Sequence, residues 1–345
     1  MLTQVILGMA LALILVYHNI KYYTRGNRNM KIIDMHCDTL LECYRNPSHT
    51  LSSNSGHISI DKLLQGNALA QFFAIFISPK EKEGMDPYEI FNTVYETYKA
   101  QLELNSDSIK PALWTGDILS NAENSKLSAI LTIEDGVVLS DKIERVQEVF
   151  DKGVRLITLT WNFENAIGYP SSDDPAEHAR GLKPFGIEVV EEMNRLGMLI
   201  DVSHLSEGGF YDVAKYSKKP FVASHSCARA LCNHRRNLSD DQLKTLGNQG
   251  GMVGVNFYSA FLKEDSEYAT IDQIVEHVKY MVNKAGIESV GFGSDFDGID
   301  CELEFKDYAS YPLLLSALSK HFTEDQVDAI CNGNALRVLK ENLGK

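Results

Sequence analysis

Three of the residues in this chain that can ligate a metal ion or move a proton stand at the ends of two short apolar runs. The first run ends in His36-Cys37-Asp38. A histidine and a carboxylate two positions apart on a strand point the same way, so both can reach one ion. A later run ends in Glu134. A carboxylate directly after an apolar run must be paired, hydrogen-bonded or bound to metal, because an isolated buried charge is costly.

Three more such residues end later runs. His204 and His225 are 21 positions apart, which is the length of one strand–helix unit, and Asp295 ends the last run. Each residue alone has a structural alternative, such as a histidine that bonds a nearby acid or an aspartate that caps a turn. Their recurrence at equivalent positions on successive runs favours a shared site instead.

Together these residues supply three imidazoles and three carboxylates, more than one tetrahedral zinc ion takes. They suit two ions about 3.5–4 Å apart with a bridging carboxylate. Glu134 is the natural bridge. His36 and Asp38 would hold one ion, and the two later histidines would hold the other. Nitrogen and oxygen donors fit two Zn²⁺ per chain, and Mn²⁺ or Co²⁺ would suit the same donors.

The elements that must position these residues are eight apolar runs. Several are continuous rather than alternating, which is typical of strands buried on both faces of a parallel sheet. The runs are Lys31–Cys37, Leu69–Ile77, Ala129–Ile133, Arg155–Thr160, Met198–Val202, Pro220–Ala223, Met252–Phe257 and Ser289–Phe292.

Most of these runs are followed by a segment with helical patterning. The segments are Pro87–Leu104, Ile143–Asp151, Pro184–Leu196, Gly208–Tyr216, Ser239–Leu246 and Ile271–Ala285. Eight strand–helix alternations predict an α/β fold, a (β/α)8 TIM barrel, with a doubly wound parallel sheet as the alternative. We expect Tyr311–Leu343 to add C-terminal helices outside the barrel. Catalytic groups of such barrels come from the C-terminal strand ends and the loops after them, so all six residues would meet at one mouth.

Composition excludes several classes of protein. The chain has 33 Lys and Arg against 47 Asp and Glu, and the resulting charge of −14 disfavours nucleic-acid binding. Its 44% apolar and 23% charged residues are ordinary for a globular protein, not for a disordered or polytopic membrane protein. The six cysteines contain no CxxC pair, which indicates reduced thiols.

Residues 1–29 lie outside the predicted barrel, which comprises residues 30–345. Their apolar run Leu2–Tyr17 is shorter than the ~20 residues that span a bilayer, and the basic residues follow it. The segment is either an uncleaved membrane tether through residues 2–20 or a dispensable extension. If it inserts, the positive-inside rule leaves the catalytic domain facing the cytoplasm.

Six motifs carry a resemblance to a known family. MHCDTL, TIEDG, DVSHLS, SHS, RRNLSDD and GSDFDG follow one another between about residue 30 and the C-terminus. In this order they resemble the membrane (renal) dipeptidase family of binuclear metal-dependent amidohydrolases. The specific part is an HxD motif followed by a bridging glutamate, since most other binuclear amidohydrolases carry HxH there.

The resemblance implies roles for individual residues. It implies one zinc ion on His36, Asp38 and Glu134, and a second on Glu134, His204 and His225. It also implies that Asp295 is the catalytic acid, and that the family's homodimer applies here.

The resemblance further implies a set of substrate contacts. Arg236 matches the arginine that binds the terminal carboxylate of the substrate, and Tyr258 matches a weaker contact. Some members read LTH after the fourth strand, where this chain has Leu159-Thr160-Trp161-Asn162. Trp161 can pack on a substrate but has no imidazole N–H to donate to the reacting oxygen. The role of that histidine would therefore pass to Asn162 or be lost.

The expected function is hydrolysis of dipeptides by a hydroxide between two zinc ions, with Asp295 moving the proton and Arg236 holding the substrate carboxylate. One alternative is another binuclear metal hydrolase on the same barrel, such as a lactonase or a deaminase. A second alternative is a non-catalytic binding barrel tethered by the N-terminal segment. Arg236 and Glu134 favour substrates that are peptides with a free carboxylate.

Overall fold

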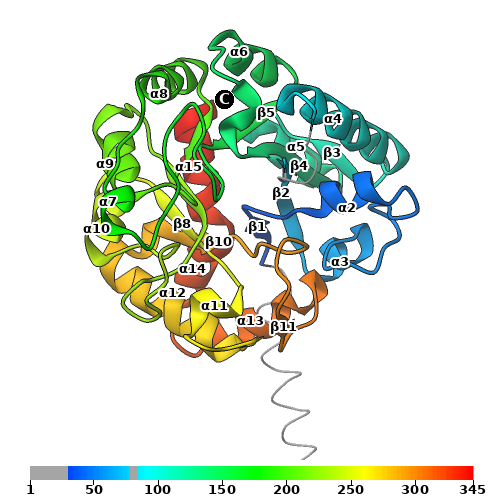
Figure 1. Ribbon diagram of the computed structural model, residues 1–345. Coiled ribbons are helices and arrows are strands. Elements are labelled where there is room, and N and C mark those ends of the chain that lie inside the picture. The colour runs from blue at the N-terminus through cyan, green and yellow to red at the C-terminus, as the bar shows by residue number, and fades with distance from the viewer. Residues whose placement is uncertain (1–29, 78–83, 345) are drawn as a thin grey trace, which may run out of the picture.

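Eight parallel strands form a closed barrel in the computed structural model, which describes residues 30–77 and 84–344 (Figure 1). The order is β2-β1-β10-β8-β7-β6-β5-β4, and pairing of β2 with β4 closes the ring. The predicted TIM barrel is therefore confirmed, because a doubly wound sheet would stay open. The barrel strands are β1 (Ile32–Asp34), β2 (Ala68–Phe76), β4 (Leu127–Glu134), β5 (Val154–Thr158), β6 (Leu199–Asp201), β7 (Val222–Ser226), β8 (Met252–Val255) and β10 (Val290–Phe292).

Three short strands lie outside this ring. β3 (Ile109–Pro111) pairs with the first residues of β4, while β9 (Tyr268–Ala269) and β11 (Glu302–Leu303) form a two-stranded sheet of their own.

Helices surround the strands, as Figure 1 shows in a view into the barrel. Three helices have the predicted bounds: α4 (Pro87–Leu104), α8 (Pro184–Leu196) and α12 (Ile271–Ala285). Three others differ by one or two residues at an end: α6 (Glu144–Asp151), α9 (Glu207–Tyr216) and α10 (Asp240–Asn248). The remaining α-helices are α2 (Thr39–Arg45), α3 (Ile60–Gln65), α5 (Thr115–Glu123), α7 (Pro175–His178), α11 (Ser259–Leu262), α13 (Tyr311–Leu318), α14 (Glu324–Asp328) and α15 (Asn334–Leu343). Gly197, at φ +82°, ends α8 in a conformation that glycine adopts without strain.

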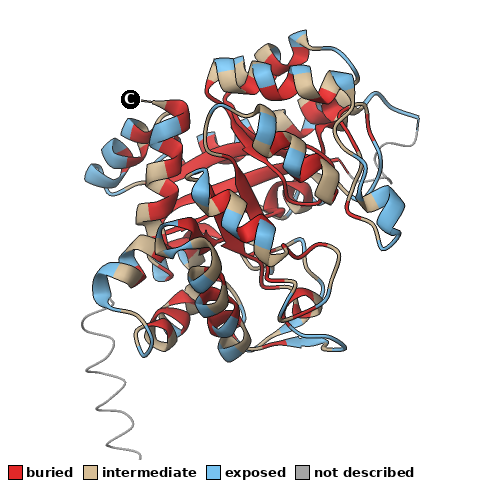
Figure 2. Ribbon diagram, turned by 90° about the vertical axis from the view of Figure 1, so that its left-hand side faces the viewer, coloured by how far each residue is buried: buried red, intermediate tan, exposed pale blue. Residues whose placement is uncertain are grey.

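The core has two layers, because successive strand residues point to opposite faces of the sheet. One layer fills the barrel interior and includes Ile33, Phe72 and Ile130, and the other, with Ile32, Phe73 and Leu131, packs against the helices. The strands are buried and the helices turn their exposed residues outward (Figure 2). None of the helices within residues 30–77 and 84–344 is long and apolar enough to cross a membrane. The predicted tether, residues 2–20, lies outside these ranges.

The C-terminal helix α15 has a place that its sequence did not predict. We expected it outside the barrel, and it does lie outside the strands. Its residues Ala335, Val338 and Leu339 nevertheless belong to the interior core layer, and α15 contacts β6, β8 and β10. The helix therefore covers the end of the barrel opposite the strand C-termini, and leaves the other end open for a site.

Candidate metal centre and active site

His36, Asp38 and Asp295 come together from the loops that follow the neighbouring strands β1 and β10. The backbones of the two loops are paired, since Asp295 N donates to His36 O (3.3 Å) and Asp38 N donates to Phe296 O (3.0 Å). His36 Nε2 lies 3.4 Å from Asp38 Oδ2 and 3.7 Å from Asp295 Oδ1. Gly298 allows this approach, because a Cβ there would stand 2.1 Å from Asp38 Oδ2 and 2.6 Å from Asp295 Oδ1.

Glu134, at the end of β4, stands between these residues and the two later histidines. Its Oε2 lies 3.4 Å from His36 Nε2. Its Oε1 lies 3.0 Å from His204 Nε2 and 3.6 Å from His225 Nε2. The residue is 4% exposed, so its charge needs a partner inside the protein. Each carboxylate oxygen thus faces one of the two groups that the sequence predicted as separate ion sites.

His204 follows β6, and His225 lies in β7. In both rings the Nδ1 atom contacts a side-chain oxygen. His204 Nδ1 lies 2.9 Å from Asn162 Oδ1, and His225 Nδ1 lies 2.8 Å from Ser224 Oγ. The opposite ring atoms converge, with a separation of 3.0 Å between the two Nε2 atoms. An imidazole whose Nδ1 is held by an oxygen presents its Nε2 lone pair to a metal ion.

The residues present fit divalent cations. His36 Nε2 and Asp38 Oδ1 are buried and have no hydrogen-bond partner among the described residues. His36, Glu134 and His225 form one set of donor atoms within reach of a single ion, and His36, Asp38 and Asp295 form another. Buried nitrogen and oxygen atoms that lack other partners are the donors that Zn²⁺ and related ions take.

The protonation of the cluster also indicates that these residues fit a divalent cation. Burial raises the pKa of Glu134 to about 8, although His36 opposes this. Burial would lower the pKa of His36, but Glu134 and Asp38 raise it well above its usual value. Without a cation the cluster therefore keeps protons that a metal ion would displace on binding. Burial lowers the pKa of His204 and His225 well below the usual value, so both are neutral, as metal ligands must be.

Asp295 also accepts a hydrogen bond from a residue that was not predicted from the sequence. Asn256, fully buried after β8, donates from Nδ2 to Asp295 Oδ2 at 2.8 Å. Burial raises the pKa of Asp295, with His36 opposing. Asp295 and His204 both have positive φ, at +64° and +69°. For residues other than glycine this conformation costs free energy and often occurs at functional sites.

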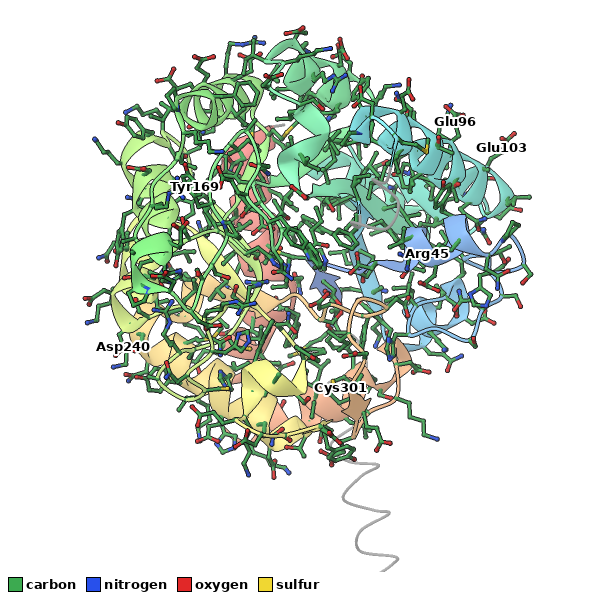
Figure 3. The ribbon with its side chains drawn as sticks, viewed as in Figure 1. Arg45, Glu96, Glu103, Tyr169, Asp240 and Cys301 are labelled. Atoms are coloured by element: carbon green, nitrogen blue, oxygen red, sulfur yellow. The ribbon has the colours of Figure 1, made fainter. Side chains whose placement is uncertain are left out.

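A cavity of about 330 Å³ opens onto the cluster. Its walls include Asp38, Glu134, His204 and Asp295, together with the predicted substrate contacts Trp161, Asn162 and Tyr258. Arg45 also lines it and is labelled in Figure 3. A larger cleft of about 1090 Å³ adjoins the cavity and shares Tyr258 and Asp300 with it.

Trp161 forms an aromatic wall of this cavity. Its ring centroid lies 4.9 Å from that of Phe76 and 5.6 Å from that of Phe163. The neighbouring Asn162 contacts the candidate ligand His204 through its side-chain oxygen. Trp161 thus presents an aromatic surface to the cavity, and Asn162 contacts a candidate ligand at its edge.

Arg236 is buried beside the cluster rather than among the residues that line the cavity. Its Nη2 donates to His225 O at 3.4 Å, and its Nε has no partner among the described residues. Burial lowers the pKa of Arg236 to about 10, while Asp295 and Glu134 oppose this, so the guanidinium stays charged at neutral pH. A buried cation with unused donors is suited to an anionic ligand.

Two residues that contact the predicted cluster, and a third behind them, were not predicted from the sequence. Asn256 binds Asp295, Ser224 contacts His225, and Asp201 binds Ser224. One signal was available for Asp201, because an aspartate ends the apolar run before His204. Asn256 and Ser224 gave no comparable signal, since their roles depend on contacts between strands.

Comparisons with known proteins agree with this geometry. The sequence profile of the family described as membrane dipeptidase (peptidase family M19) matches residues 24–344. An uncharacterized dipeptidase of Schizosaccharomyces pombe is 34% identical over 303 residues, which cover 83% of this chain and 72% of that protein.

Two solved structures are similar over most of the chain. One is the metallopeptidase "dipeptidase AC" of family M19, with a TM-score of 0.85 and 26% identity over 92% of this chain and 100% of that one. The other is a metallopeptidase from Rhodobacter sphaeroides with a phosphinate mimic of the dipeptide L-Ala-D-Ala. It has a TM-score of 0.81 and 26% identity, and the match covers 91% of this chain and 99% of that one.

Proposed function

The chain belongs to the membrane dipeptidase family, peptidase family M19, and from this premise we propose that it hydrolyses dipeptides at the cluster around Glu134. The family makes the protein a metallopeptidase of the dipeptidase class. We also propose which residues hold the metal, how many ions bind and how the proton moves.

Two divalent cations, Zn²⁺ first among them, fit the donor atoms. His36, Asp38 and Glu134 would hold one ion. Glu134, His204 and His225 would hold the other, with Glu134 using both carboxylate oxygens. When bound, such ions lower the pKa of a water toward 7 and polarise the carbonyl of the substrate.

Asp295 is proposed to move the proton of the reaction. Its Oδ2 is occupied by the amide of Asn256, which leaves Oδ1, on the side of His36, to take a proton from water and return it to the leaving amine. Burial raises its pKa, which brings the carboxyl nearer to the range where it can both accept and donate. Such general acid–base catalysis contributes typically 10²–10⁴-fold in rate.

Arg236 is proposed to bind the terminal carboxylate of the dipeptide. Its unused Nε and its buried charge support this role. A guanidinium can bind a carboxylate through two parallel hydrogen bonds, which also fixes its orientation. A carboxylate fixed in a buried position leaves no room for another residue beyond it, so longer peptides would be excluded. Trp161 and Tyr258 would contact the substrate from the cavity wall.

The observation that carries the proposal is that each carboxylate oxygen of Glu134 faces a different group of donors. The test is to measure metal content together with hydrolysis of a panel of dipeptides, lactones and nucleobases, before and after chelation. We expect dipeptide hydrolysis that chelation abolishes and added Zn²⁺ restores. Hydrolysis of lactones or deamination of nucleobases without dipeptidase activity would overturn the proposal, and so would metal content below one ion per chain.

We also propose a membrane tether and a homodimer for this protein. The apolar run Leu2–Tyr17, with basic residues after it, supports a tether through residues 2–20 that leaves the barrel facing the cytoplasm. Membership in the family supports a homodimer of dipeptide-binding barrels. Fractionation of the full chain against a chain starting at Met30 tests the tether, and sedimentation of the purified protein tests the dimer.

A further inference from the structure

A buried hydrogen-bond network contacts His225 on the Nδ1 side of its ring. Its centre is Asp201, the last residue of β6, whose side chain is fully buried. Asp201 Oδ1 accepts from Ser203 N (3.0 Å) and Ser224 N (2.8 Å). Asp201 Oδ2 accepts from Thr158 Oγ1 (2.6 Å) and Ser224 Oγ (2.5 Å). Neighbouring strands β5, β6 and β7 are thus joined through one carboxylate.

The network fixes the direction of the hydrogen bond to His225. A serine hydroxyl has one hydrogen, and Ser224 gives it to Asp201. The contact of 2.8 Å between Ser224 Oγ and His225 Nδ1 then requires a hydrogen on the ring nitrogen. His225 therefore carries its proton on Nδ1 and keeps the Nε2 lone pair toward Glu134 Oε1, 3.6 Å away.

We infer that Asp201 is a positioning residue that acts through the Ser224 hydroxyl to hold His225 in the tautomer that binds metal. The inference rests on the proposed function in one respect, which is that His225 is a metal ligand. Carboxylates that orient ligating histidines are common around metal sites, and their loss typically costs 10–100-fold in metal affinity. Here the carboxylate would act through an intervening hydroxyl.

The partner of His204 does not impose the same constraint. Asn162 presents an amide that can accept through its oxygen or, after rotation, donate through its nitrogen. The amide is exposed on the loop after β5, whereas Ser224 and Asp201 are buried. Of the two histidines, His225 is therefore the one whose tautomer the protein fixes.

The isosteric variant Asp201→Asn should reverse the network. The amide oxygen would face the two backbone N–H groups, so the NH₂ group would donate to Ser224 Oγ. Ser224 would then turn its hydrogen toward His225 Nδ1 and favour the tautomer with the proton on Nε2, which has no lone pair for an ion. Ser224→Ala removes the hydroxyl without reversing the network. Thr158→Val is the matched control, because it removes another donor to Asp201 Oδ2 but leaves Ser224 and His225 in contact.

The first readout is titration of each metal-free full-length protein with Co²⁺ alone, followed by visible absorption to resolve the two binding steps. We expect Asp201→Asn to weaken one step about 100-fold, Ser224→Ala to weaken the same step about 10-fold, and Thr158→Val to stay within about threefold of wild type. The second readout is ¹⁵N NMR of histidine rings in the metal-free protein. It should show His225 protonated on Nδ1 in wild type and on Nε2 in Asp201→Asn.

Unchanged Co²⁺ affinity in both Asp201→Asn and Ser224→Ala overturns the inference, and so does a wild-type His225 protonated on Nε2. If Asp201→Asn does not fold, wild-type affinity in folded Ser224→Ala overturns it. A purely structural role for Asp201 would weaken both binding steps alike and would leave the tautomer unchanged. Failure of the proposed function gives a different result, since the wild-type protein would bind Co²⁺ with the fixed tautomer but hydrolyse no dipeptide.

Discussion

The Nε2 atoms of His204 and His225 lie 3.0 Å apart, and Glu134 Oε1 lies within 3.6 Å of both. If each ring donates its Nδ1 proton to the oxygen that it contacts, these three atoms face one another with lone pairs only. Such an arrangement is repulsive unless a cation or a proton lies among the atoms. Without a cation, the raised pKa of Glu134, about 8, keeps a proton at this point, and metal binding would displace that proton.

Metal removal should consequently lower the stability of the protein as well as its activity. A ligand that binds only the folded state stabilises it by about 2.7 kcal/mol at a concentration 100 times its dissociation constant. We expect the Tm to fall after chelation and to recover when Zn²⁺ is added in excess of the chelator. Differential scanning calorimetry of the two samples measures this. An identical Tm in both, with metal loss confirmed by elemental analysis, would contradict the prediction.

Asp295→Asn should abolish most catalysis while the metal ions stay bound. The amide keeps the shape of the carboxyl group and cannot exchange a proton, so we expect kcat to fall about 10²–10⁴-fold. The two measurements are steady-state kinetics on a dipeptide and metal content per chain. A variant with both ions and full activity would remove Asp295 from the proton pathway, whereas loss of an ion would identify it as a ligand instead.

Arg236→Ala should mainly raise KM, because the proposed contact holds the substrate carboxylate both before and during the reaction. The variant should also lose the discrimination that wild type shows between a dipeptide and the same dipeptide with a C-terminal amide. Arg235→Ala is the matched control, since Arg235 is half-exposed and pairs with Asp173 at 2.5 Å. Unchanged KM for Arg236→Ala, or an equal effect of both substitutions, would place the carboxylate elsewhere.

The sequence predicted the barrel well because its strands are continuous apolar runs and its longer helices carry clear end signals. Thr270 is the N-cap of α12 and forms a capping box with Gln273 in its first turn, and α8 ends at Gly197. The helix α5 and the strand β3 were not predicted. β3 has three residues, of which only Ile109 is buried, so it has no apolar run to detect. The position of α15 depends on contacts with strands far away in the chain, which local patterns do not encode.

The candidate site was predicted from the sequence about as well as the fold was. Its six central residues end strands that the barrel rule brings to one mouth, and the structure does bring them together. The contacts behind them were not predictable. Ser224 lies next to His225 in sequence, but its hydrogen bond to Asp201 depends on how two neighbouring strands align. Asn162 likewise reaches His204 only through the path of its loop. Their partners are set by the loop conformation and by the strand register.

His277 offers a test of pH-dependent stability away from the candidate metal centre. It is 1% exposed on α12, accepts a hydrogen bond from Ala228 N on Nδ1 (3.1 Å), and lies 3.0 Å from Leu262 O through Nε2. Both nitrogens of the neutral ring therefore make hydrogen bonds, with Nδ1 as the acceptor and Nε2 as the donor. Burial is the main reason that the pKa of His277 is lowered from its usual 6.5, and the Leu262 carbonyl opposes it.

Because the folded state holds His277 with a lowered pKa, the unfolded chain binds more protons once the pH falls below about 6.5. The free energy of unfolding should therefore be complete above this pH and decrease below it, by at most about 1.4 kcal/mol per pH unit from this residue. His277→Gln removes the titration but not the other histidines. We expect its destabilisation relative to wild type, measured by urea unfolding, to be smaller at about pH 5.5 than at pH 7. An equal difference at both pH values would show that His277 does not titrate between them.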